Sequence, residues 1–206
     1  NLDATPSPFI HYWSLAVEAQ FYLVWPLFIL LLARSGKKIV LIGITVITGL
    51  SLLLSIYQTQ TSPIWAFYSL PTRAWELGIG ALLLFIPNKV FGNKFLPWIG
   101  FIGIVISSLF FDEKTAFPGM NAVLPVFATA LLIATIAIWP PIFNDLSNNR
   151  MSQWLGKISY PLYLWHWPAL VLPSSALGRP LRVRERLACI VLTVILAHFT
   201  NKFIEE

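Results

Sequence analysis

Charged residues are scarce in this sequence of 206 amino acids, and their scarcity indicates the class of protein. Asp, Glu, Lys and Arg together make up 11% of the chain, whereas they make up about a quarter of an ordinary soluble domain. Hydrophobic residues make up 57%, and the mean hydropathy is +0.72. These values exclude an ordinary soluble domain and predict an integral membrane protein.

Cysteine is nearly absent too, and the start of the chain has neither a secretory signal nor a Met. The single Cys189 lies in an apolar run, which excludes internal disulfides and cysteine-based metal clusters, and we expect no bound metal or cofactor. The chain starts with NLDATPSPF, which is not a secretory signal and does not begin with Met, so we expect a piece of a longer protein. We assign the net charge of +5 to basic loops at a membrane, not to nucleic-acid binding.

Long apolar runs occur at seven places, each close to the roughly 20 residues that a helix needs to cross a bilayer. Proline-containing breakers separate them, and the runs are too long and too evenly apolar for barrel strands. No linker or short repeat divides the chain. We therefore predict one all-α, polytopic membrane domain with about seven transmembrane helices, at Trp13–Ala33, Ile39–Tyr57, Trp65–Ile86, Phe95–Phe111, Ala122–Trp139, Trp154–Leu172 and Leu187–Ile204.

Basic residues are unevenly distributed among the connections. Those at positions 34–38, 89–94 and 150–157 alternate onto one side, which the positive-inside rule makes cytoplasmic. The connection 173–186 disagrees, because alternation places it outside. Three interpretations stay open: contact with lipid headgroups, binding of an anionic acceptor or lipid head, or a segment that does not cross. The basic residues of this connection are Arg179, Arg182, Arg184 and Arg186.

A carboxylate, Glu18, lies inside the first apolar run. At membrane depth a carboxylate costs roughly 2.5–3.5 kcal/mol, and it usually faces a partner or a watery cavity. On a helix, spacings of three and four residues place Glu18 on one stripe with His11, Ser14, Tyr22 and Trp25. We expect this stripe to face other helices, not lipid.

Two further segments carry polar side chains at helical spacing. Arg73 and Glu76 are neighbours on a helix. They either form an internal ion pair, or Arg73 has another role, which is to bind a phosphate or carboxylate or to steady Glu18. In the sixth segment Ser159, Tyr163 and His166 share a face, and His166 is either a packed, hydrogen-bonded residue or part of a site. Nearby glycines, Gly78 and Gly80, are expected to let helices approach closely.

Depth connects these segments. With a rise of about 1.5 Å per residue, Glu18, Arg73, Glu76 and His166 all fall roughly 8–17 Å below the outer membrane boundary. Three segments far apart in the sequence thus place ionisable groups in one layer. The sequence therefore predicts one polar site in the outer half of the membrane.

Several strings together resemble a known family. HYWSLAVEAQFYLVWPL, FYSLPTRAWELGIGALL, FPGMNAVLPVFATALLIA, WLGKISYPLYLWHWPAL and the closing FIEE are similar, in this order, to the motifs of bacterial acyltransferase family 3. These membrane O-acyltransferases acetylate O-antigens, peptidoglycan and other surface glycans. The resemblance implies that residues 1–206 are the C-terminal part of a roughly ten-helix, multi-pass domain of the bacterial inner membrane, without its first three or four helices.

The resemblance also implies an activity and its partners. An acyl group, usually acetyl, would pass from cytoplasmic acyl-CoA to a hydroxyl of a cell-envelope glycan or lipid-linked saccharide, with membrane lipid around the protein. The family's proposed catalytic histidine lies on a helix that this chain lacks, and His11 does not replace it. The expected catalytic residues are Glu18, Arg73 and His166, and the expected substrate-binding residues are Trp13, Ser14, Glu76, Ser159, Tyr160 and Tyr163.

Two other classes of membrane protein remain as alternatives. A transporter or flippase would use the ionisable layer as a substrate or proton path, and it is expected to show inverted repeats, which the sequence lacks. A non-catalytic scaffold would use its polar groups only to hold helices together. Neither of these consumes acyl-CoA, which separates both from the enzyme.

Overall fold

The computed structural model describes residues 7–112 and 114–205, and every regular element in these ranges is a helix. The all-α prediction is confirmed. The chain divides into two compact units, a large unit of residues 15–141 and a small unit formed by residues 1–14 with 142–206. Each unit is described by itself below.

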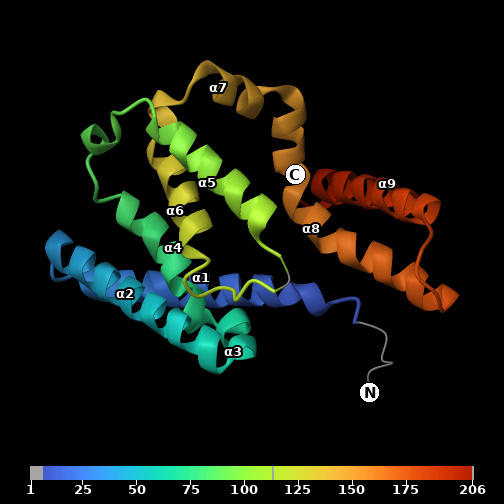
Figure 1. Ribbon diagram of the computed structural model, residues 1–206, viewed down its shortest axis with the longest axis horizontal. Helices are drawn as coiled ribbons and strands as arrows, with labels where there is room; N and C mark the ends of the chain where they lie inside the picture. Colours follow the sequence, from blue (N-terminus) through green and yellow to red (C-terminus); the bar gives the residue numbers. More distant parts are fainter. Residues whose placement is uncertain (1–6, 113, 206) are drawn as a thin grey trace. The chain divides into compact units, whose positions relative to one another are not determined.

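The large unit holds most of α1 and three packed pairs of helices. Helix α2 packs against α4, α5 against α6, and α4 also contacts α6, as Figure 1 shows. The short helix α3 connects α2 to α4 and contacts both. The elements are α1 (Trp13–Ala33), α2 (Lys37–Thr61), α3 (Pro63–Tyr68), α4 (Leu70–Leu83), the 3-10 turn η2 (Asn88–Phe91), α5 (Leu96–Phe110), α6 (Val123–Ala134) and η3 (Ile136–Ile138).

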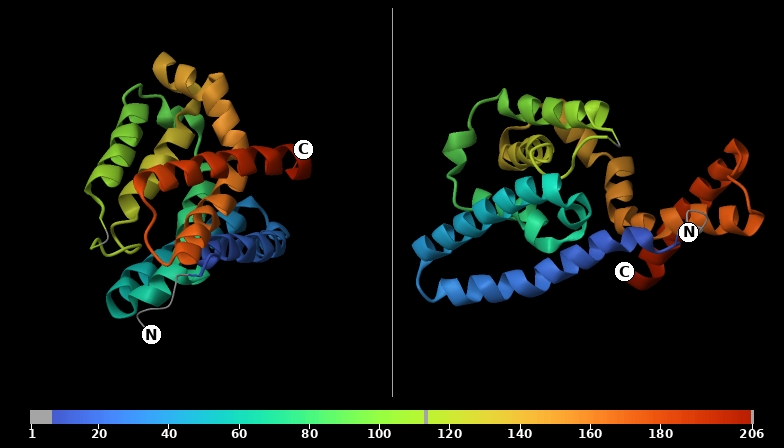
Figure 2. Two further views of the ribbon diagram at one scale, coloured as in Figure 1. Left: turned by 90° about the vertical axis from the view of Figure 1, so that its right-hand side faces the viewer. Right: turned by 60° about the horizontal axis from the view of Figure 1, so that its bottom comes forward.

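The small unit consists of a helical hairpin together with the first residues of the chain. Helices α8 and α9 lie side by side and are connected by a short turn (Figures 1 and 2). Helix α8 contains three prolines and changes direction along its length, as expected where prolines remove backbone donors. The elements are η1 (Ile10–Tyr12), α7 (Pro141–Asn148), α8 (Arg150–Leu177), α9 (Val183–Thr200) and the terminal π turn η4 (Asn201–Glu205).

Three helical stretches of the described chain are long and apolar enough to cross a membrane: Ile10–Ala33, Lys37–Thr61 and Val183–Glu205. Helices α5 and α6 are apolar but shorter. Helix α8 is long enough, but tryptophan, tyrosine, histidine and proline interrupt its apolar residues. The structure thus supports a multi-pass membrane protein and confirms three of the seven predicted spans by length and composition.

The third predicted span is divided in two. Ser69 separates α3 from α4 with an extended backbone, φ −101° and ψ 142°. Pro71 lies in the first turn of α4, and because proline has no N–H it cannot continue the hydrogen-bond ladder from α3. The buried Thr72 hydroxyl closes the break, because its single proton is shared between the carbonyls of Ala66 and Ser69, which lie 2.8 and 2.9 Å from Oγ1.

Close packing of α2 on α4 depends on Gly78, as the sequence predicts. A Cβ built at Gly78 would lie 2.2 Å from Thr48 Oγ1 and 3.2 Å from Thr48 Cβ, so rotating the threonine does not clear the space. The same expectation is wrong for Gly80, where an added Cβ has no described atom within 4 Å. Gly78 therefore sets the distance between the two helices, and Gly80 does not.

Replacing Gly78 with alanine is expected to lower the free energy of unfolding by about 1–3 kcal/mol, because the helices must move apart. Thermal unfolding of the purified protein in detergent measures this. The control is Gly80→Ala, which adds the same methyl group on the same helix into open space and is expected to be neutral or to stabilise by up to about 1 kcal/mol. Equal stability of the two variants would contradict the close contact with Thr48.

Candidate active site

Residues of the first sequence motif contact α8 in the small unit. The Tyr163 hydroxyl donates to the His11 carbonyl at 2.6 Å and lies 2.5 Å from Ser14 Oγ. A phenol has one proton, and Tyr163 gives it to a carbonyl, so the Ser14 hydroxyl is the donor in the second contact. Trp167 Nε1 also donates to the Ser7 carbonyl at 3.0 Å. The predicted residues Ser14 and Tyr163 therefore meet, although 149 positions separate them.

The imidazole of His166 is oriented by its own helix. His166 Nδ1 lies 2.6 Å from the Tyr163 carbonyl oxygen. A carbonyl can only accept, so Nδ1 carries the proton, and in the neutral ring Nε2 then has a free lone pair. The His166 and Tyr163 ring centroids are 5.3 Å apart. His166 is thus both packed and hydrogen-bonded, and it presents a nitrogen that can accept a proton.

His11 completes this group, although the sequence analysis placed it on the polar stripe and not among the expected catalytic or substrate-binding residues. Its ring centroid is 5.0 Å from that of His166 and 5.3 Å from that of Tyr163. Both His11 ring nitrogens are buried, and neither forms a hydrogen bond of full geometry with another described residue, although the backbone at Tyr163 and Leu164 lies close to the ring. The signal in the sequence that could have assigned His11 to the site was the polar stripe of the first segment, to which His11 belongs. We name His11, Ser14, Tyr163 and His166 the histidine cluster.

Three other predicted residues belong to the small unit and are not members of the histidine cluster. Ser159 is exposed and donates to the Gly156 carbonyl of its own helix at 2.8 Å. Tyr160 is also exposed. Trp13 is half-buried at the start of α1. Substrate binding by these three residues stays a prediction.

In the large unit, Arg73 and Glu76 form the predicted ion pair. Arg73 Nε and Nη2 donate to the two carboxylate oxygens of Glu76 at 3.3 and 3.0 Å. The side chains are 23% and 19% exposed, so the pair is largely shielded, and the guanidinium also lies 5.9 Å from the centroid of the Phe67 ring. The ion-pair interpretation is confirmed, and this bidentate contact fixes the direction of the Arg73 fork.

Two features keep this ion pair in place. Ser51 of α2 donates to the Pro71 carbonyl at 2.6 Å and accepts from the Trp75 N–H at 3.0 Å, which anchors the turn of α4 that carries Arg73. Trp75 itself is fully buried.

Glu76 lines a mostly apolar cavity of about 270 Å³, together with Ile79, Gly80, Phe117, Pro125, Val126, Thr129, Ala130 and Ile133.

Glu18 lies on α1 in the large unit with an exposed side chain, and it forms no ion pair with another described residue. Tyr22, on the same stripe, is 68% exposed. Ser14, by contrast, faces α8. His166 belongs to the small unit, so a meeting of Glu18 and Arg73 with His166 stays a prediction. No group of three or more metal-ligating side chains occurs within residues 7–112 and 114–205.

The fold and these sites define a multi-pass helical membrane protein with shielded polar groups on separate segments. Residues 1–200 match the family model described as an acyltransferase domain. The chain belongs to acyltransferase family 3, as its motifs predicted.

Three relatives show the kind of protein this chain resembles. YrhL of Bacillus subtilis (strain 168), provisionally named a peptidoglycan O-acetyltransferase, is 32% identical over 98% of this chain. The peptidoglycan O-acetyltransferase OatA of Listeria monocytogenes is 30% identical over 97%, and the O-acetyltransferase OatA of Staphylococcus aureus is 31% identical over 96%. The chain spans 35–36% of the length of these relatives. No solved structure matches it.

Proposed function

We propose that the protein is an O-acyltransferase of the bacterial cytoplasmic membrane, which transfers an acetyl group from acyl-CoA to a hydroxyl of a cell-envelope saccharide such as peptidoglycan. The histidine cluster carries the proposal, because it joins side chains of two motifs within a chain that matches the family over residues 1–200. The names of the relatives support an envelope glycan as the acceptor.

The reaction requires three things of the protein. The hydroxyl oxygen attacks the thioester carbonyl, a C–O bond forms, the C–S bond breaks, and the hydroxyl proton ends on the CoA thiolate. A base must accept that proton, positive charge or donors must stabilise the oxyanion, and water must be excluded. An acyl-transfer enzyme in a membrane therefore needs a base and a group that stabilises the oxyanion, both shielded from water.

In this proposal His166 is the base. Its Nδ1–H is held by the Tyr163 carbonyl, so Nε2 is free to take the proton of the acceptor hydroxyl. Tyr163 and Ser14 hold the main chain at His11 against α8. The backbone at Tyr163 and Leu164 only partly satisfies the buried nitrogens of His11, and in this proposal a polar group of the substrate completes their hydrogen bonding.

In this proposal Arg73 and Glu76 act on acyl-CoA, the donor of the acyl group. The Arg73 guanidinium offsets negative charge on a donor phosphate or on the oxyanion, and Glu76 keeps its fork in one direction. The cavity beside Glu76, about 270 Å³ and mostly apolar, suits an acyl group better than a saccharide. The Tyr163 carbonyl already orients His166, so the role proposed for Glu18 is to supply negative charge that stabilises the imidazolium formed when the base takes the proton.

The test is an assay of the full-length protein in membrane vesicles with radiolabelled acetyl-CoA and peptidoglycan. We expect label to enter the glycan as an ester that mild base releases, with one free CoA thiol for each ester. A transporter or a scaffold would leave acetyl-CoA intact. Unchanged acetyl-CoA in vesicles that contain the folded protein and its acceptor would overturn the proposal.

A further inference from the structure

The turn between α8 and α9 concentrates positive charge at one end of the helical hairpin. Together with the first residues of α9 it spans positions 179–186, called the arginine turn below, which hold four arginines and one glutamate, a net charge of 4 − 1 = +3. Helix α9, which begins at Val183, is the start of a stretch that is apolar enough to span a membrane. The charge therefore lies where such a helix leaves the hydrocarbon.

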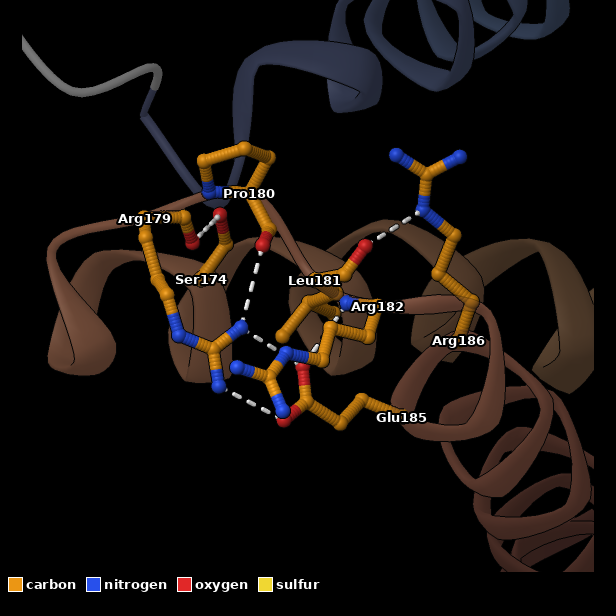
Figure 3. A network of polar contacts seen from close by, with 7 residues as sticks. All are labelled: Ser174, Arg179, Pro180, Leu181, Arg182, Glu185 and Arg186. Atoms are coloured by element: carbon orange, nitrogen blue, oxygen red, sulfur yellow. Dashed lines mark hydrogen bonds and ion pairs between the residues drawn. The ribbon is translucent and has the colours of Figure 1, made fainter.

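The only acidic group of the turn is already occupied. Glu185 accepts two hydrogen bonds from the Arg179 guanidinium, at 2.7 and 2.9 Å, and one from the Arg182 N–H at 2.7 Å (Figure 3). The hydrogen bonds to Glu185 raise the pKa of Arg179 above its ordinary value. Ser174 also donates to the Arg179 carbonyl at 3.1 Å. Glu185 thus organises the turn and is not available to the remaining arginines as a full counter-charge.

Three guanidinium groups remain exposed, those of Arg182, Arg184 and Arg186. Arg186 uses Nε to donate to the Leu181 carbonyl at 3.0 Å, and its two terminal nitrogens point away from Glu185 (Figure 3). Neither Arg184 nor Arg186 forms an ion pair with any residue of the described chain. Both present donors that match the geometry of a phosphate.

An exposed apolar stripe continues from these arginines along α9. Val183, Leu187, Ile190 and Val191 are 72%, 57%, 53% and 58% exposed, and their spacing of three and four residues places them on one face. Arg184 precedes Leu187 by three residues, and Arg186 precedes Ile190 by four. Cationic side chains therefore stand at the end of the stripe.

We infer that this arginine turn binds the phosphate headgroup of an anionic phospholipid, with an acyl chain along the stripe on α9. The charge of the turn selects an anion, and the adjoining apolar stripe selects a lipid over a soluble phosphate. Lipid binding also explains why connection 173–186 is rich in arginine, although the alternation of loops places it on the outer side, where the positive-inside rule predicts few basic residues. The inference is independent of the proposed acyl transfer.

The test measures binding of phosphatidylglycerol to the purified protein in phosphatidylcholine nanodiscs, by native mass spectrometry. The double variant Arg184→Gln/Arg186→Gln is expected to bind phosphatidylglycerol roughly 10- to 30-fold more weakly, at about fivefold for each cation. The control is Lys37→Gln/Lys38→Gln, which removes the same charge from exposed residues at the start of another candidate span. The control is expected to bind like the wild type, and an equal loss in both variants would overturn the inference.

Two further measurements separate a lipid from a soluble anion. Glycerol phosphate and inorganic phosphate, which lack acyl chains, are expected to compete poorly with phosphatidylglycerol. The variant Leu187→Ser/Val191→Ser, which changes only exposed side chains, is expected to weaken lipid binding and leave the arginines unaltered. Competition by glycerol phosphate at the affinity of the lipid, or full lipid binding by the serine variant, would overturn the assignment to a phospholipid.

Discussion

The variant His166→Gln is expected to transfer acetyl groups roughly 10²- to 10⁴-fold more slowly than the wild-type protein, the contribution typical of a general base. Glutamine can still donate to the Tyr163 carbonyl, which His166 Nδ1 contacts at 2.6 Å, but it cannot take up a proton. The measurement is the initial rate of ester formation on the glycan at saturating acetyl-CoA. The loss is expected in kcat.

The matched control for this variant is His198→Gln. His198 lies on α9 of the same unit, is exposed, accepts a long hydrogen bond from Trp154 Nε1 at 3.5 Å, and has ring contacts with Trp154 and Phe199. Its replacement is expected to leave the rate within about twofold. If His166→Gln were as active as this control, His166 would be a packing residue, which was the alternative that its sequence left open.

A second large effect is expected at Glu18. The variant Glu18→Gln keeps the size of the side chain and removes its charge, and we expect transfer to fall by about 10²- to 10⁴-fold with unchanged amounts of protein in the membrane. The physical reason is that an amide cannot stabilise the imidazolium that forms when the base takes a proton. Ester formation and immunoblotting of the same membranes measure both quantities.

The control for Glu18 is Glu205→Gln. Glu205 is an exposed glutamate at the end of η4, where it accepts from Asn201 Nδ2 at 2.9 Å. This variant is expected to be fully active. Full activity of Glu18→Gln as well would remove Glu18 from the site, and its exposed carboxylate on α1 would then have no part in the transfer.

Helix boundaries were predictable from the sequence where composition changes sharply. The predicted segment Trp13–Ala33 has the same bounds as α1, because a polar connection with Arg34 follows an unbroken apolar run. The division at Ser69 was not predicted, since the residues on both sides are apolar and only Pro71 marks the break. Helix α7 was missed because its eight residues are too few and too polar to resemble a span.

The candidate site was predictable within each motif and not between motifs. Helical spacing correctly paired Arg73 with Glu76, and Tyr163 with His166. The contact of Ser14 with Tyr163 depends on tertiary packing, which periodicity does not encode. His11 was set aside because it did not match the expected catalytic histidine, although its ring lies beside that of His166.

One measurement tests most directly whether groups from distant segments act on one acyl transfer: a double-mutant cycle with Glu18→Gln and His166→Gln. If both residues serve the same proton transfer, the double variant should be about as slow as the slower single variant, because residues that act as a unit are not additive. Losses that multiply in the double variant would instead mean that Glu18 and His166 act independently, and the proposed shared centre would be contradicted.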